Sequence, residues 1–182
     1  MKRIKLPLEL AQEVMKKLSE IEYGFPDENG NNILITNADK WDNEFYNFYY
    51  LQSPQELLNS KIGVCWEQVE LERYLFKKNN IKTNTYFICS YNGNELPSHT
   101  ILVFKQNKNY YWFEHSWGMY RGIYKYNSIK ELLNDVVSKF KRDNKINNNV
   151  ETKVYKYTTP LIHTTCENFY KFVEQFKVVM KK

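Results

Sequence analysis

Cys65 is the residue of this sequence best placed to act as a nucleophile. It lies in the segment KIGVCWEQ, residues 61–68, where a helix is expected to begin within a residue or two of the cysteine. Free backbone N–H groups and the helix dipole at a helix N-terminus favour thiolate over thiol. The same N–H groups can stabilise an oxyanion on a substrate carbonyl. Gly63 allows a sharp turn into this helix. The alternative is that Cys65 is a small buried hydrophobic residue, as most isolated cysteines are.

The other two cysteines have weaker claims to reactivity. Cys89 lies in an expected apolar strand, so we interpret it as a small buried hydrophobic residue. Cys166 falls in the first turn of the expected last helix, but no base is expected near it, so it is a minor rival to Cys65.

His99 is the expected base. It opens the strand His-Thr-Ile-Leu-Val-Phe after a loop that ends in Pro-Ser. From the mouth of a strand, an imidazole can take the proton of a thiol held by another element and later return it to the leaving group. The alternative is a histidine that simply satisfies its hydrogen bonds at the edge of a strand.

An acidic partner for His99, which would complete a catalytic triad with Cys65, follows from the register of the hairpin formed by residues 98–105 and 110–116. An even-numbered loop places Lys105 opposite Tyr110, so that paired residue numbers sum to 215. Glu114 is then diagonal to His99 on the same face of the sheet. An odd-numbered loop shifts the parity and brings His115 there instead. Glu114 is favoured, because a carboxylate both fixes the tautomer of a histidine and stabilises its imidazolium. The alternative is a solvated strand residue.

The helices and strands that must position these residues can be predicted from hydrophobic periodicity, helix-capping residues and turn residues. An amphipathic helix is expected at 6–22, and Ser53-Pro54-Gln55-Glu56 has the N-cap, proline and glutamate that begin a short helix ending near Ser60. Residues 23–50 are ambiguous, with a possible short strand at 33–36. The remaining expectations are a helix from about 65 to 80, a strand at 82–90, a turn at 92–94, the hairpin, a helix from Ser128 to about 142, a strand at 150–158 and a last helix from Thr164. This order indicates an α+β fold with an antiparallel sheet.

The order and spacing of these motifs resemble the transglutaminase-like superfamily, which shares the papain-like Cys-His-Asp arrangement. Gly-x-Cys-Trp opens a helix, a histidine follows 34 residues later on a strand, and an acid follows after a further 15 in W-x-E. The matching stretch runs from about residue 53 to 126. The resemblance implies that Cys65 is the nucleophile, His99 the base and Glu114 the orienting acid. The chain departs from the family pattern in carrying Glu where the acid is usually Asp.

Length, charge and composition limit the domain number and the partners that can be expected. The chain has 182 residues, enough for a single domain spanning 1–182 with its own core, and a formal net charge of +5 from scattered basic residues rather than a basic stripe. No nucleic-acid partner is therefore expected. No signal peptide or membrane span is evident, which predicts a cytoplasmic protein with three reduced cysteines and no membrane partner. Histidines and cysteines lack the spacing of a zinc site, so neither a metal nor a cofactor is expected.

Several residues near the motifs could form a substrate cleft. Trp66 and Trp117 can wall it or pack in the core, and Arg121 can bind a substrate carboxylate or pair with a local acid. Glu72 shares a helix arc with Cys65 and is expected to be a partly buried acid that needs a partner, without a catalytic role.

The expected reaction is acyl transfer from an amide of a peptide or protein through a thioester. Hydrolysis by a peptidase, amidase or deamidase is favoured, because it needs no special acceptor site; transfer to an amine is the variant. The rival from another class is a non-catalytic binding module on the same fold, which the Asp-to-Glu departure favours.

Overall fold

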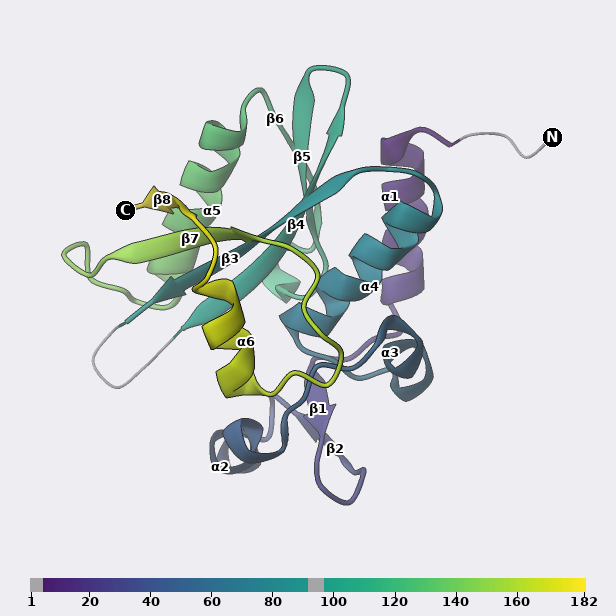
Figure 1. Cartoon of the computed structure of the whole chain (residues 1–182), viewed down its shortest axis with the longest axis vertical. Coiled ribbons are helices and arrows are strands. Elements are labelled where there is room, and N and C mark those ends of the chain that lie inside the picture. Colours follow the sequence, from purple (N-terminus) through teal and green to yellow (C-terminus); the bar gives the residue numbers. More distant parts are fainter. Residues whose placement is uncertain (1–4, 92–96) are drawn as a thin grey trace.

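The computed structural model describes residues 5–91 and 97–182. Its centre is a six-stranded antiparallel sheet with the strand order β6-β5-β4-β3-β7-β8 (Figure 1). The strands of this sheet are β3 (Thr83–Ser90), β4 (Ser98–Gln106), β5 (Asn109–Glu114), β6 (Gly122–Tyr126), β7 (Thr152–Tyr157) and β8 (Val178–Lys181). The helices are α1 (Pro7–Leu18), α2 (Ala38–Phe48), α3 (Pro54–Ser60), α4 (Cys65–Lys78), α5 (Ile129–Asp143) and α6 (Cys166–Val173), with a short 3-10 turn at Gly118–Tyr120. The α+β architecture expected from the sequence is confirmed.

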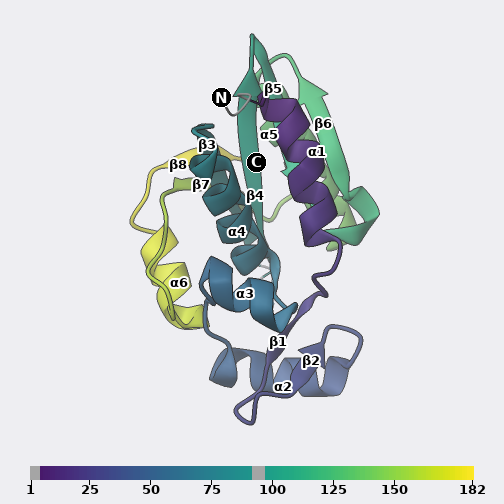
Figure 2. The same ribbon diagram turned by 90° about the vertical axis from the view of Figure 1, so that its right-hand side faces the viewer.

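Helices pack against both faces of the sheet (Figure 2). Leu102 and Phe104 of β4 join a core with α1 and α4, whereas Ile101 and Val103 of the same strand join a core with α5. Six consecutive residues of β4, from His99 to Phe104, are therefore buried, because both faces of a central strand are covered. A third core lies between α6, the first turn of α4 and the N-terminal hairpin.

The capping signals located two helices well. The Ser53 side chain accepts a hydrogen bond from Glu56 N–H, and the Glu56 carboxylate accepts one from Ser53 N–H, so α3 starts at Pro54. It ends at Ser60. Ser128 caps α5, which runs to Asp143. The last helix begins one residue later than expected, because Thr165 rather than Thr164 is its N-cap.

Other expectations need correction. The first helix ends at Leu18 rather than near residue 22. The ambiguous region 23–50 forms the hairpin of β1 (Gly24–Pro26) and β2 (Asn32–Leu34) followed by α2. Strands β6 and β8, at the two edges of the sheet, were not anticipated from the sequence. The turn expected at 92–94 lies outside the described residues.

Over the described ranges, no helix is long and apolar enough to cross a membrane.

Candidate active site

Cys65 is the first residue of α4, as the sequence predicted, and its side chain is buried. Val64 is the N-cap, and its N–H donates to Glu67 Oε2 at 3.1 Å, which fixes where the helix begins. Gly63 keeps the preceding segment close to α3, since a Cβ there would lie 2.6 Å from Leu57 Cδ1. Close packing rather than a left-handed turn therefore explains this glycine. The N–H groups of the first turn lack intrahelical acceptors, which leaves positive potential beside the thiol.

His99 and Glu114 form a buried pair. His99 is the second residue of β4 and Glu114 is the last residue of the neighbouring strand β5. His99 Nε2 lies 2.8 Å from Glu114 Oε2. The β4–β5 hairpin has a two-residue loop, with Lys105 paired to Tyr110 and Leu102 to Phe113, which confirms the even-numbered register. Because Glu114 occupies Nε2, Nδ1 is the ring nitrogen left for the Cys65 thiol.

The Cys65 and His99 side chains change each other's protonation. Burial raises the pKa of the Cys65 thiol, but hydrogen bonding to His99 and the charge of its imidazolium outweigh burial, so that the pKa is lowered from its ordinary value. Burial lowers the pKa of His99, yet the Glu114 carboxylate and the Cys65 thiolate together raise it to about 10. Both shifts favour a thiolate–imidazolium pair near neutral pH.

Glu114 is held in place by further donors. Its Oε1 accepts hydrogen bonds from Ser116 Oγ at 3.0 Å and from Trp117 N–H at 2.8 Å. The Trp117 ring meets the His99 ring edge to face, with centroids 5.0 Å apart. The longer side chain of Glu thus spans the diagonal to His99 while its other oxygen is anchored on the following loop. Trp117 covers the pair from one side.

His115, the alternative from an odd-numbered loop, is not the partner of His99. Its Nδ1 shares a hydrogen bond of 2.6 Å with Gln68 Oε1, and its Nε2 is buried without a partner among the described residues. Burial, with the nearby charge of Arg121, lowers the pKa of His115 to about 4, so its ring is neutral at physiological pH.

The two remaining cysteines differ from Cys65 in their surroundings. Burial raises the pKa of Cys89 to about 12 and that of Cys166 to about 12. Cys166 is the first residue of α6, but within residues 5–91 and 97–182 no histidine or other base lowers the pKa of its thiol. All three thiols are free.

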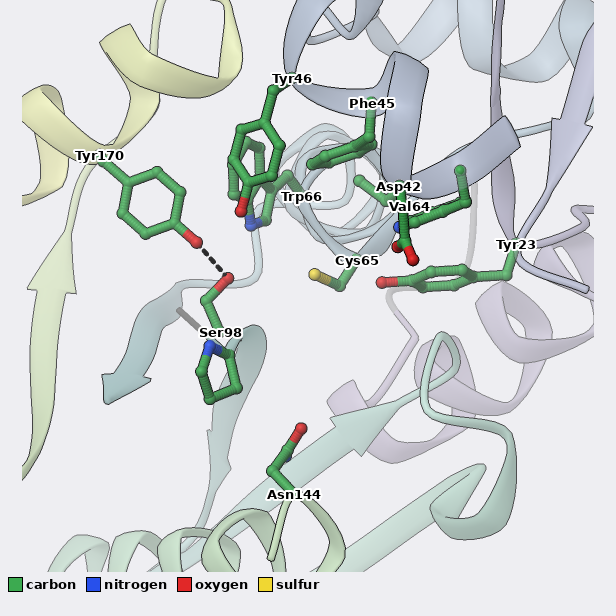
Figure 3. A pocket seen from close by; sticks show the side chains of 12 residues that line it. Tyr23, Asp42, Phe45, Tyr46, Val64, Cys65, Trp66, Ser98, Asn144 and Tyr170 are labelled. Carbon is green, nitrogen blue, oxygen red and sulfur yellow. Dashed lines mark hydrogen bonds between the residues drawn. The ribbon is translucent and has the colours of Figure 1, made fainter. Parts of the chain in front are cut away.

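Two hollows meet at the Cys65–His99 pair. The first, of about 600 Å³, is lined by Cys65 and by aromatic side chains of α2, the first turn of α4 and α6 (Figure 3). The second, of about 550 Å³, is lined by His99, by Trp117 and by Arg121. Tyr23 and Ser98 border both, so the two hollows form one cleft across the pair.

Tyr23 is a candidate functional residue that the sequence analysis missed. Figure 3 shows its hydroxyl pointing toward Cys65. Burial raises the pKa of Tyr23 well above its ordinary value, with a further rise from the charge of Cys65 and from hydrogen bonding to its thiol, so the hydroxyl keeps its proton. Nothing in the sequence pattern around residue 23 signals this position.

The backbone holds Tyr23 at this place. Glu22 N–H donates to Lys61 O at 2.9 Å and Gly63 N–H donates to Glu22 O at 3.1 Å, a parallel bridge to the segment that leads into α4. The Tyr23 ring stacks on Trp41, with centroids 5.8 Å apart.

The three residues expected to bind substrate lie around the cleft in different ways. Trp66 is buried and stacks on Phe169 with centroids 4.0 Å apart, so it is chiefly a core residue whose edge lines the first hollow. Trp117 and Arg121 line the second hollow. Arg121 is exposed, and its Nε donates to His115 O at 3.1 Å.

Glu72 is a fully buried acid, more so than the sequence suggested. Its Oε2 has no hydrogen-bond partner among the described residues. Burial raises the pKa of Glu72 well above its ordinary value, and the charges of Glu114 and Glu70 raise it further. No group of three or more His, Cys, Asp or Glu side chains that could hold a metal ion occurs in the described part of the chain.

A helix that begins with a cysteine and packs on an antiparallel sheet bearing a histidine and an acid defines a transglutaminase-like domain. The comparison with protein families agrees: the model of DUF553, a transglutaminase-like domain, matches residues 7–152. The chain belongs to this family, which confirms the resemblance noted in the sequence. No curated protein matches the chain significantly.

Proposed function

We propose that this protein is a cysteine-dependent enzyme that transfers the acyl group of an amide, with Cys65, His99 and Glu114 as its catalytic triad. The observation that carries the proposal is the linked set of interactions at the triad: the His99–Glu114 contact of 2.8 Å and the mutual pKa shifts of Cys65 and His99. Membership of the transglutaminase-like family supports a cysteine enzyme in general but names no reaction.

The reaction begins with attack of the Cys65 thiolate on the amide carbonyl carbon. The carbonyl oxygen becomes an oxyanion, which the Cys65 backbone N–H and the Tyr23 hydroxyl stabilise by hydrogen bonds. His99 then gives its proton to the leaving nitrogen, the C–N bond breaks and a thioester remains. Glu114 keeps the imidazole oriented and stabilises its charged form throughout.

Water completes the cycle in the reaction we favour. His99, now neutral, takes a proton from a water molecule that attacks the thioester, and Cys65 leaves as the thiolate. An amine that took the place of this water would give cross-linking instead. Hydrolysis is preferred because it needs no acceptor subsite. We place the enzyme in the cytoplasm, and the three free thiols support this location.

The proposal is tested by the rate at which iodoacetamide alkylates each cysteine across a range of pH, measured by mass spectrometry. Cys65 should react fastest and remain reactive well below pH ~8.5, the ordinary thiol value, while Cys89 and Cys166 stay nearly inert. His99→Ala should abolish the low-pH reactivity, and His163→Ala, which alters an exposed histidine paired with Glu56, should not.

The rival proposal, a non-catalytic binding module, makes the opposite prediction. Cys65 would then react as an ordinary thiol with or without His99, and it would form no acyl intermediate with a reactive ester. That result would end the enzyme interpretation.

A further inference from the structure

The two hollows beside the triad carry charges of opposite sign. Asp42, on α2, is the one acidic side chain among the described residues that line the first hollow, and no basic side chain lines it. Arg121 is the one arginine or lysine among those that line the second hollow, and no acidic side chain lines that one. An anionic group on a substrate is therefore repelled from the first hollow and attracted to the second.

The chemistry of the triad assigns the hollows to the two parts of an amide. The leaving nitrogen must lie where His99 can protonate it, and His99 lines the second hollow. The acyl group stays bonded to Cys65, which lines the first. The second hollow therefore receives the amine part of the substrate and the first receives the acyl part.

Arg121 has donors with which to bind an anion in the second hollow. Its Nε is held by the carbonyl oxygen of His115 at 3.1 Å, which leaves the two terminal nitrogens of the guanidinium for a ligand. None of the acidic side chains in the described ranges forms an ion pair with Arg121. A guanidinium that presents two N–H donors matches the geometry of a carboxylate.

The acyl side has a different character. Trp41, Phe45 and Tyr46 of α2 line the first hollow together with Trp66 and Tyr170 (Figure 3). Such walls favour a flat or apolar side chain on the acyl group.

From these observations we infer that the substrate is a peptide-like amide whose leaving amine carries a carboxylate, as a C-terminal amino acid does, and that Arg121 binds this carboxylate. The inference rests on the proposed function, because it takes the leaving group to lie on the His99 side. It deepens that function to a peptidase that releases a carboxylate-bearing amino acid. Such a leaving group excludes simple deamidation, in which ammonia departs.

Two alkylating probes of the same shape test the inference. N-iodoacetylglycine and N-iodoacetylglycinamide deliver the same reactive carbon to Cys65 and extend beyond an amide nitrogen with either a carboxylate or a neutral amide. The rate of Cys65 alkylation at low reagent concentration and low salt is measured for both. The acid should react about tenfold faster than the amide with the wild type, the factor that a charge-assisted contact contributes.

Variants identify the source of the preference. Arg121→Gln should bring the ratio of the two rates, acid over amide, to about one. The ratio is taken within each variant, so that a general change in Cys65 reactivity cancels. Lys105→Gln, which removes one positive charge at the end of β4 away from His99, should keep the preference for the acid. Equal rates for the two probes in the wild type, or a preference that survives Arg121→Gln, would overturn the carboxylate inference.

The failure of the proposed function has its own signature in the same experiment. If neither probe alkylates Cys65 faster than it alkylates a free thiol below pH ~8.5, the triad is not activated, and both the function and the inference fall. If the glycinamide probe reacts rapidly but the acid shows no advantage, the function stands and only the carboxylate inference fails.

Discussion

Glu114 reaches His99 across a diagonal of the sheet rather than from the directly opposed position. Its Oε2 lies 2.8 Å from His99 Nε2, while its Oε1 accepts hydrogen bonds from Ser116 and Trp117. The two oxygens thus have separate tasks: one orients the imidazole and the other ties the carboxylate to the following loop. This division of tasks gives a physical reason for Glu at the position where the Cys-His-Asp pattern noted in the sequence analysis has Asp.

Glu114→Gln should lower the pKa of His99 from about 10 toward the ordinary histidine range, because the carboxylate charge that stabilises the imidazolium is lost. The pH window in which thiolate and imidazolium coexist then narrows from its alkaline side. The titration of His99, followed by nitrogen-15 NMR, measures the shift directly. Acylation by a reactive ester at neutral pH should fall by about 10² or more.

A matched control and a shorter acid sharpen this prediction. Glu56→Gln alters the exposed Glu56–His163 pair in the same way and should leave His99 unchanged. Glu114→Asp keeps the charge but removes one methylene, so it should also lower the pKa of His99 and the acylation rate. Full activity in Glu114→Asp would show that reach across the diagonal is unimportant.

The parts of the site that sequence analysis could locate depend on local rules. The start of α4 at Cys65, the strand at His99 and the two-residue loop that sets the register follow from caps, alternation and turn residues close by in the chain. Asn107, in that loop, adopts a left-handed φ of 57°, which asparagine tolerates better than most residues. The hairpin alone limited the partner of His99 to Glu114 or His115, according to the parity of the loop, and the chemistry of a carboxylate favoured Glu114.

The parts that the sequence did not reveal depend on contacts between distant segments. A parallel bridge between Glu22 and Ile62 holds Tyr23 beside the segment that leads to Cys65. The residues around Tyr23 show no hydrophobic periodicity that would have predicted this position. Strand β8 was missed because the T-x-x-E pattern marks only where the last helix begins, whereas α6 ends at Val173 and a strand follows it. The charge difference between the two hollows likewise requires α2 and the loop after β5 to meet beside the triad.

Replacing Glu72 should stabilise the protein at neutral and alkaline pH. The pKa of this buried acid is raised in the folded state, so the folded protein holds a proton that the unfolded chain releases above pH ~4.3. Stability therefore falls as the pH rises through that value toward the higher folded pKa. Glu72→Met removes the charge and the unpaired oxygen and should raise the free energy of unfolding at pH 8 by about 1–3 kcal/mol.

Urea unfolding at pH 5 and pH 8 checks both parts of this prediction. The loss of stability between the two pH values should be smaller in Glu72→Met and in Glu72→Gln, since neither variant can release that proton. If Glu72→Met were less stable than the wild type at pH 8, the carboxyl would have a favourable role in the fold that its contacts do not reveal.

Three glycines allow a graded test of how the chain near the site is packed. A Cβ on Gly24 would lie 2.4 Å from the backbone oxygen of Ile33, whereas a Cβ on Gly63 would meet the movable end of Leu57 at 2.6 Å. A Cβ on Gly118 would meet nothing within 4 Å. Since backbone cannot yield as a side chain can, Gly24→Ala should cost most, about 2–3 kcal/mol, Gly63→Ala about 1 kcal/mol, and Gly118→Ala close to nothing. Denaturant midpoints give this order, and a reversed order for Gly24 and Gly63 would contradict the packing described.

Tyr23→Phe should separate the two kinds of reaction that Cys65 can undergo. Acylation by p-nitrophenyl acetate passes through an oxyanion, and loss of one oxyanion donor should slow it by about 10². Alkylation by iodoacetamide forms no oxyanion, so its rate on the thiolate plateau should change by only a few-fold. Tyr46→Phe, which removes another hydroxyl from the same hollow, is the matched control and should leave both rates near those of the wild type.

The comparison also distinguishes an oxyanion donor from a residue that only tunes the thiol. If Tyr23 acted solely through its hydrogen bond to the thiol, Tyr23→Phe would shift the pH profile of both reactions equally, and the two plateau rates would keep their wild-type ratio. A fall in that ratio by about two orders of magnitude, with little movement of the alkylation profile, is the outcome expected when the hydroxyl stabilises the developing oxyanion.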